Sequence, residues 1–164
     1  MHPAQLPPEE LLKDCEARRL RRSGPGGQHR NKVETAVVLT HQPTGLSAEA
    51  NERRSQEQNR QVALHRLRVR LAVEHRDDAR QAPTPLWGSR SRGGKLSVNP
   101  EHEDFPALLA EALDAIAACD WNESTAAERL GVSRTQLVKL LRLAPQALML
   151  LNTHRAEQGH KPLS

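Results

Sequence analysis

The sequence predicts an α+β fold, in which a small β-sheet with packed helices is followed by a small all-α, helix-turn-helix-like segment. Three observations lead to this prediction. A β-branched run at residues 35–40 and an alternating run at 46–50 are separated by the turn residues 43–45, which is typical of a hairpin. Apolar residues then recur at helical spacing from residue 56 to about 76, and again from 105 to about 155.

The first residues of the chain give weaker signals. Residues 1–8 contain three prolines and predict a disordered or loosely ordered leader. Residues 11–22 predict a short helix followed by a strand, and the glycines and proline of residues 23–28 then interrupt regular structure.

A long amphipathic helix is expected after the hairpin. Ser55 and Gln58 have the spacing of a capping box. The opposite side of this helix carries four arginines, which could meet phosphate or simply form a solvated face: Arg60, Arg66, Arg68 and Arg70.

The composition changes at residues 81–100, where Pro, Gly, Ser and Arg are frequent and a flexible linker is expected. Beyond it, one helix is predicted at 105–119. Two short helices around Gly131 form a helix-turn-helix, with Ser133 capping the second, and a last helix closes the bundle. The expected division is therefore residues 1–80, a linker at 81–100, and a helical domain at 101–164.

Charge is unevenly distributed along the chain. Residues 1–95 hold 18 Lys and Arg against 11 Asp and Glu, whereas residues 96–164 hold 6 against 9. A net charge of +7 in the first part favours a nucleic-acid partner, although a solvated charged surface is an equal alternative. No secretory signal or membrane span is recognised, so a cytoplasmic location is expected. The isolated Cys15 and Cys119 and the scattered histidines predict no metal site, and no cofactor is implied.

The most informative motif is Gly26-Gly27-Gln28. Adjacent glycines allow backbone angles that other residues avoid, so their N–H groups can approach a ligand closely. A neutral glutamine offers both a donor and an acceptor, and it can orient a water molecule without ionising.

The blocks around this motif closely resemble the catalytic domain of class I peptide-chain release factors, over about Cys15 to Leu71. The matching blocks are residues 22–32, 35–37, 41–45 and 53–60. The resemblance implies a domain that enters the peptidyl transferase centre of the ribosome and hydrolyses the ester of peptidyl-tRNA. Gly26, Gly27 and Gln28 would be catalytic, the Gln28 backbone N–H stabilising the oxyanion and its side chain placing water.

The same resemblance implies supporting residues and partners. Six residues are expected to bind ribosomal RNA: Arg22, Ser23, Arg30, Asn31, Lys32 and Arg54. Asn31 and Arg54 could equally hold the backbone of the loop. A glutamine methyltransferase acting on Gln28 is a further expected partner. Because the chain leaves no room for stop-codon-reading domains, it is expected to be a codon-independent, stand-alone factor of the ribosome-rescue type.

The segment from Trp121 to Arg142 is similar to the helix-turn-helix of Fis-type DNA-binding domains. Its second helix carries Arg134, Lys139 and Arg142, which could contact nucleic acid. The net negative charge of this part also allows a purely structural helix pair. The alternative function is therefore a non-catalytic RNA- or DNA-binding protein, in which a degenerate release-factor domain is combined with the helix-turn-helix.

Overall fold

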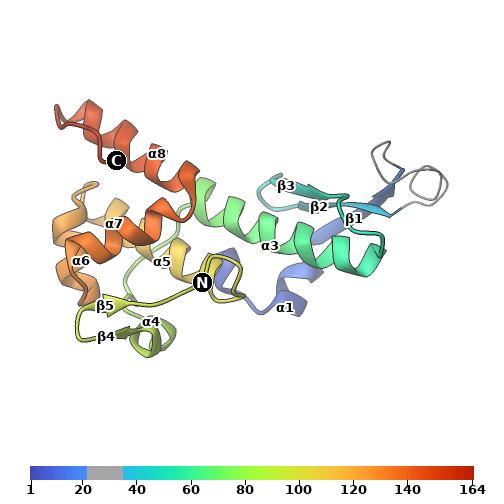
Figure 1. Cartoon of the computed structure of the whole chain (residues 1–164), viewed down its shortest axis with the longest axis horizontal. Coiled ribbons are helices and arrows are strands. Elements are labelled where there is room, and N and C mark those ends of the chain that lie inside the picture. The colour runs from blue at the N-terminus through green and yellow to red at the C-terminus, as the bar shows by residue number, and fades with distance from the viewer. Residues whose placement is uncertain (22–34) are drawn as a thin grey trace.

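The structure is a computed structural model that describes residues 1–21 and 35–164 (Figure 1). The loop predicted to be catalytic therefore lies outside the described residues. The elements, in chain order, are η1 (Pro3–Gln5), α1 (Pro8–Lys13), β1 (Cys15–Leu20), β2 (Ala36–His41), β3 (Ser47–Ala50), α3 (Gln56–Glu74), α4 (Pro85–Arg90), β4 (Ser91–Arg92), β5 (Lys95–Leu96), α5 (Phe105–Ala118), α6 (Glu123–Leu130), α7 (Arg134–Arg142) and α8 (Pro145–Glu157).

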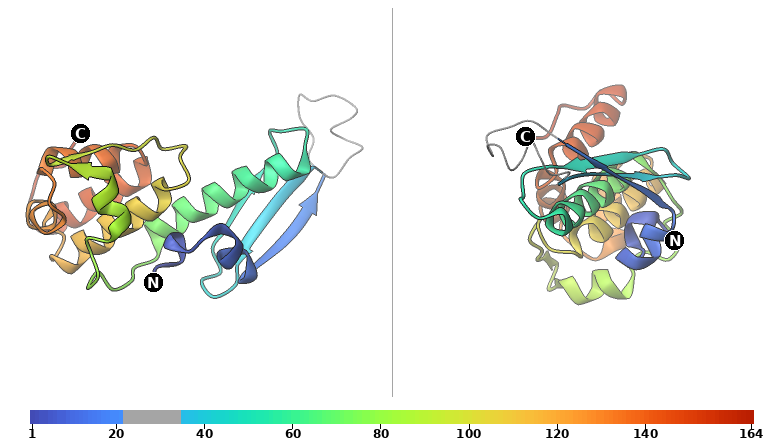
Figure 2. Two further views of the ribbon diagram at one scale, coloured as in Figure 1. Left: turned by 90° about the horizontal axis from the view of Figure 1, so that it is seen from below. Right: turned by 90° about the vertical axis from the view of Figure 1, so that its right-hand side faces the viewer.

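The first sheet is an antiparallel meander of order β1-β2-β3. In β2 the side chains alternate, and Val37 and Leu39 are buried while Val38 and Thr40 are partly exposed. Helix α3 lies along one face of the sheet, as Figure 2 shows, and the buried side chains of β2 share a hydrophobic cluster with those of α3. The predicted hairpin and the long helix after it are thus confirmed.

Arginines of α3 cover the outer edge of this sheet. Arg66 Nη1 donates to the carbonyl oxygen of Glu49 at 2.9 Å, and Arg70 Nη1 donates to that of Ser47 at 2.8 Å. Since β3 is an edge strand, these bonds satisfy carbonyls that would otherwise face solvent or another chain. Arg68 differs from the expected exposed arginines, because it is only 6% exposed.

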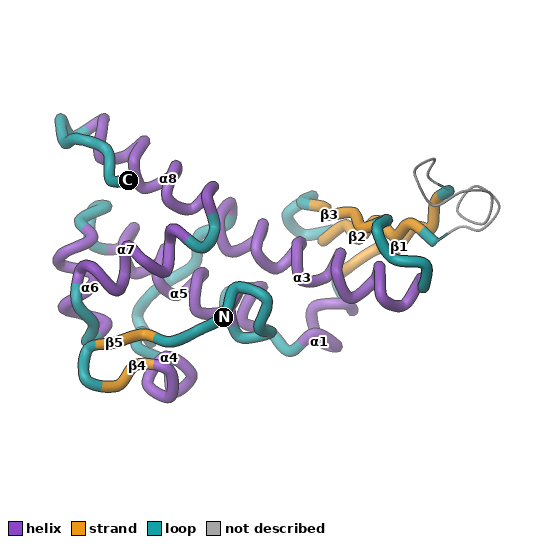
Figure 3. The backbone as a smooth tube through the Cα atoms, in the orientation of Figure 1, coloured by secondary structure: helices purple, strands orange, loops and turns teal. Residues whose placement is uncertain are grey.

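Helix α5 forms the centre of the second half of the molecule. Its residues from Phe105 to Ile116 are all buried, so it is covered on every side. Helix α3 packs along it, and α6 and α7 lie on its other sides (Figures 1 and 3). The predicted helix-turn-helix is confirmed as α6, the left-handed Gly131 at φ +70° and α7, whose N-cap Ser133 accepts a hydrogen bond from Gln136 N.

The expectation of a loosely ordered leader is wrong. His2 is 1% exposed and caps η1, its Nδ1 accepting from Ala4 N at 3.0 Å. Its Nε2 lies 2.9 Å from the carbonyl oxygen of His75, and Arg68 Nη2 donates to the carbonyl oxygen of Ala4 at 2.9 Å. Proline-rich composition did not reveal that these few side chains fit between α3 and α5.

Residues 81–100 do not form the flexible tether that their composition suggested. They contain α4 and the β4–β5 hairpin, and Trp87 of α4 is fully buried. The Trp87 Nε1–H donates to the carbonyl oxygen of Leu130 at 2.9 Å, which fixes α4 to the end of α6. One tryptophan thus gives this glycine- and proline-rich segment its own buried anchor. The predicted domain boundaries, at residues 80 and 101, remain a prediction.

Candidate functional site

The two strands that flank the glycine loop are held in register up to its base. Leu20 at the end of β1 pairs with Ala36 at the start of β2. The segment between them therefore begins and ends at neighbouring points on one end of the sheet. Eight of the nine residues expected in the release-factor-like site lie outside the described residues: Gly26, Gly27, Gln28, Arg22, Ser23, Arg30, Asn31 and Lys32.

Asn59 fixes the backbone at Thr35, just before β2. Its side chain is fully buried in the first turns of α3, and Nδ2 donates to the carbonyl oxygen of Thr35 at 2.8 Å. The same Nδ2 donates to the carbonyl oxygen of Arg53 at 2.9 Å, while Oδ1 accepts from Arg53 N at 2.9 Å. One amide thereby joins the strand that leaves the loop to the turn before α3. Thr35 is itself only 6% exposed, so its carbonyl has little access to water in place of this bond.

Arg54 is the one predicted release-factor-like site residue that the structure describes. It is exposed, in the turn whose preceding residue is bonded to Asn59. Arg18 and Arg19 of β1 are exposed as well and project from opposite faces of the strand. Exposed cations therefore flank this end of the sheet, and the buried amide fixes the backbone next to Arg54.

Arg134, the first of the predicted nucleic-acid contacts on α7, forms an ion pair within the protein. Arg134 Nη2 lies 2.8 Å from Oε1 of Glu123, and Arg155 Nη1 lies 2.6 Å from the same oxygen. Burial favours the neutral form of Glu123, but the hydrogen bond from Arg134 and the charge of Arg155 outweigh it and hold its pKa below the ordinary value. Arg134 therefore joins α7 to α6.

The other predicted contacts on α7 differ from one another. Arg142 Nε donates to the backbone oxygen of Ser164 at 2.5 Å. Lys139 is exposed. All three side chains are thus exposed, and Arg134 and Arg142 each make a polar contact within the protein.

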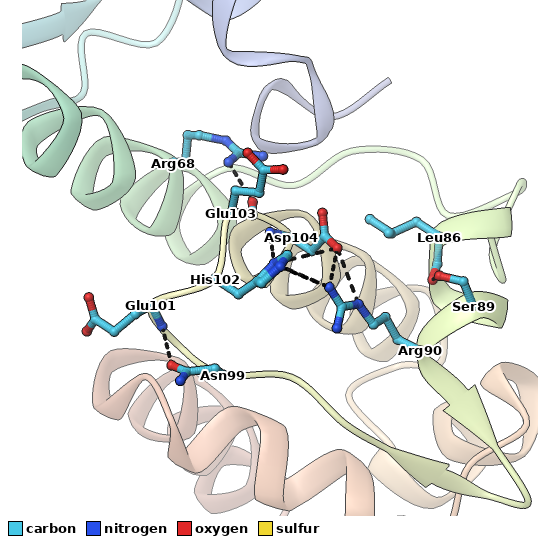
Figure 4. A network of polar contacts seen from close by, with 9 residues as sticks. All are labelled: Arg68, Leu86, Ser89, Arg90, Asn99, Glu101, His102, Glu103 and Asp104. Atoms are coloured by element: carbon cyan, nitrogen blue, oxygen red, sulfur yellow. Dashed lines mark hydrogen bonds and ion pairs between the residues drawn. The ribbon is translucent and has the colours of Figure 1, made fainter.

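A polar cluster just before α5 joins this helix to α3 and α4 (Figure 4). Arg90 Nη2 lies 2.6 Å from Oδ2 of Asp104, and Arg68 Nη1 donates to the carbonyl oxygen of Glu103 at 2.7 Å. These contacts join α4 and α3 to the residues just before α5.

Neither a metal site nor a membrane-spanning helix is found in the part of the chain that the structure describes. Within residues 1–21 and 35–164, no three His, Cys, Asp or Glu side chains are grouped so that they could hold a metal ion. Within the same residues, the helices are too short or too polar to cross a bilayer.

A three-stranded meander backed by one helix, with the glycine-rich segment between its first two strands, defines the class as an α+β domain. Residues 9–95 match the family described as the RF-1 domain. The chain belongs to this family, the class I peptide-chain release factors, through their catalytic-type domain. Residues 113–142 also match the family described as Bacterial regulatory protein, Fis family.

Curated relatives carry release-factor names. Peptide chain release factor 2 of Caulobacter sp. (strain K31) is 37% identical over 131 residues, covering 70% of this chain and 34% of that protein. Peptide chain release factor 1 of Symbiobacterium thermophilum is 36% identical over 102 residues, which is 62% of this chain and 28% of that protein. Peptide chain release factor 2 of Lactiplantibacillus plantarum is 50% identical over 93 residues, which is 52% of this chain and 24% of that protein. The chain thus spans about a third or less of the length of these relatives.

Sequence reasoning missed the role of Asn59. The residue lies four positions before Ala63 and eight before Leu67, both fully buried, so it belongs to the apolar stripe of α3. A polar amide on such a stripe signals a buried hydrogen-bonding role. That signal was present in the sequence, but its partners, Thr35 and Arg53, could be named only from the structure.

Proposed function

We propose that this chain is a codon-independent release or rescue factor, which hydrolyses the peptidyl-tRNA ester in the peptidyl transferase centre of the ribosome. The intact Gly26-Gly27-Gln28 motif, in a chain that belongs to the release-factor family, carries this proposal. The described scaffold supports it, since paired strand ends and the buried Asn59 amide hold the base of the loop.

The chemistry assigned to the loop needs no ionisable group. Water attacks the ester carbonyl, an oxyanion forms, and the bond to the 3′ oxygen of the tRNA breaks as that oxygen takes up a proton. The backbone N–H of Gln28 would donate to the oxyanion, and the Gln28 side chain would place the water. A donor fixed before charge develops, in a site with little water, can supply a large share of the rate enhancement.

Codon independence would require that parts of the chain other than a codon-reading domain select the ribosome. The family match ends at residue 95, and the helices that follow, α5 to α8, contain the Fis-family match. In this chain the basic release-factor-type domain is therefore joined to a helical half of a different kind. We assign the choice of ribosome to that half and to the charge of the first 95 residues.

The test is release of labelled peptide from ribosome complexes with a stop codon, a sense codon or a truncated message in the A site. Two substitutions separate the two roles of one residue. Gln28→Ala removes the side chain and keeps the N–H, whereas Gln28→Pro also removes the donor. Loss of one oxyanion donor lowers the rate by about 10²- to 10³-fold, so Gln28→Pro should be the more damaging change.

Gln61→Ala is the matched control, because Gln61 is an exposed glutamine of α3. It should release peptide as the wild type does. Release on sense or truncated complexes that both Gln28 variants lose would support the proposal. Release on stop-codon complexes alone would contradict codon independence, and wild-type levels in both Gln28 variants would contradict the assigned chemistry.

The alternative function is a nucleic-acid-binding protein that does not catalyse. The Fis-family match of residues 113–142 favours it. Against a groove-reading α7 stands the pairing of Arg134 with Glu123 and of Arg142 with Ser164. Ribosome binding without peptide release on any complex would decide for this alternative.

A further inference from the structure

The β4–β5 hairpin holds two cations side by side. Its turn is Gly93 at φ +59° and Gly94 at φ +76°, the pair of positive angles that a tight two-residue hairpin requires. Arg92 and Lys95 are directly opposite one another across the two strands. Side chains so paired lie on the same face of the hairpin.

The other face of the hairpin is fixed to α7. Leu96 is half-buried and packs on the hydrophobic core, so its neighbour Lys95 projects to the solvent side. Leu96 N donates to Oε1 of Gln136 at 3.2 Å, and Ser133 N donates to the carbonyl oxygen of Gly94 at 3.2 Å. The hairpin is therefore a docked element beside the second helix of the helix-turn-helix.

A third cation lies further along α7. Ser133 and Gln136 both bond to the hairpin, and Lys139 follows Gln136 by three residues, so these two are neighbours on the surface of the helix. We call Arg92, Lys95 and Lys139 the basic hairpin surface. All three are exposed.

These cations differ from their neighbours in their ion pairing within the described residues. Arg90 is paired with Asp104, and Arg134 with Glu123. By contrast, Arg92, Lys95 and Lys139 form no ion pair with any carboxylate among residues 1–21 and 35–164. Like charges directly opposite on a hairpin are destabilising. An anion bound across them would remove that repulsion.

We propose that the basic hairpin surface binds the phosphate backbone of RNA and that α7 supports it without reading a groove. The choice of RNA rests on the proposed function, in which the chain acts on the ribosome. Groove reading is disfavoured because Arg134 is paired with Glu123 and Gln136 accepts a bond from the hairpin. Backbone contacts of this kind position a protein and carry no sequence information.

The experiment measures binding of the full chain to a fluorescein-labelled RNA duplex by anisotropy, across a series of salt concentrations. The test variant is Arg92→Gln/Lys95→Gln/Lys139→Gln. The matched control, Lys13→Gln/Arg80→Gln/Lys161→Gln, removes the same charge from exposed positions elsewhere. Since each phosphate contact adds about 0.9 to the salt slope, the test variant should bind about tenfold or more weakly, with a slope smaller by about 2 to 3.

Charge itself is tested by Arg92→Lys/Lys95→Arg/Lys139→Arg, which should bind within about threefold of the wild type. Equal affinity of the test and control variants would overturn the proposal, as would tighter binding of a DNA duplex of the same sequence. The assay contains no ribosome. A Gln28→Ala variant that binds RNA normally but releases no peptide therefore separates this surface from the proposed catalytic loop.

Discussion

Replacing Asn59 with alanine tests whether the buried amide holds the base of the loop. The substitution removes bonds to the carbonyl oxygens of Thr35 and Arg53 and from Arg53 N, at 2.8, 2.9 and 2.9 Å. A typical hydrogen bond contributes about 1 kcal/mol net, and a buried group left unpaired costs about 1–3 kcal/mol. Alanine recovers a few tenths of a kcal/mol through its helix propensity. The free energy of unfolding should therefore fall by about 2–4 kcal/mol.

The assay is urea unfolding followed by circular dichroism, with Gln58→Ala as the control. Gln58 is the exposed neighbour of Asn59, and its change should stay within about 0.5 kcal/mol of the wild type. Asn59→Asp keeps the shape of the side chain but removes the donor to both carbonyls, so it should destabilise at least as much as alanine. Peptide release by the Asn59 variants should fall at temperatures where both remain folded.

The reasoning would be refuted by an Asn59→Ala protein that unfolds within 0.5 kcal/mol of the wild type. Hydrogen exchange gives a second readout. The strand that leaves the loop should lose protection in Asn59→Ala before α5 does, because the broken bond to Thr35 lies at its start. Uniform loss of protection across the chain would indicate a general loss of stability and would contradict a local anchoring role.

Three further predictions concern buried groups of the helical half and the N-terminus. Burial raises the pKa of Asp114 from 3.8 to about 6, so the folded protein binds this proton more tightly than the unfolded chain does. Up to about 3 kcal/mol of the free energy of unfolding should therefore be lost as pH rises from about 4 to 6, and urea unfolding of Asp114→Asn should not show this loss. Burial lowers the pKa of His2 from 6.5 to about 4, so the unfolded chain binds this proton more tightly than the folded protein does. About 3 kcal/mol of the free energy of unfolding should therefore be lost as pH falls from about 6.5 to 4, and His2→Gln should remove this dependence. Trp87→Phe leaves the carbonyl oxygen of Leu130 without its 2.9 Å donor and should lower the free energy of unfolding by about 1–3 kcal/mol, measured by urea unfolding. An unchanged unfolding midpoint in Trp87→Phe would contradict the anchoring of α4.

The elements that sequence predicted well are those with a strong period or a local cap. The β-branched run of β2 and the cap of Ser55 on α3 depend on neighbours in sequence, and both were found as expected. The ordered N-terminus depends on contacts of His2 with His75, 73 residues away, and no local pattern carries that information. Trp87 likewise fixes its segment through Leu130, 43 residues away.

The candidate site divides in the same way. The Gly26-Gly27-Gln28 motif was recognised from sequence and its role remains a prediction, since those residues lie outside the described part of the chain. Arg134 and Arg142 were predicted as surface cations, and both are exposed. Their contacts with Glu123 and Ser164 span 11 and 22 residues of sequence, so only tertiary structure shows them.

The unbroken helix α3 determines how far apart the two halves of the molecule work. Its 19 residues, at about 1.5 Å each, give a strut of about 28 Å, whose first turns are bonded to Thr35 and whose later turns pack along α5 (Figure 2). The distance between the end of the sheet at Thr35 and the helical half is therefore set by the number of turns in α3. Adding or removing three or four residues within α3 would change that distance by about 5 Å and rotate one half against the other. Under the proposed function, the length of α3 would therefore determine how far any contact made by α5 to α8 lies from the end of the sheet.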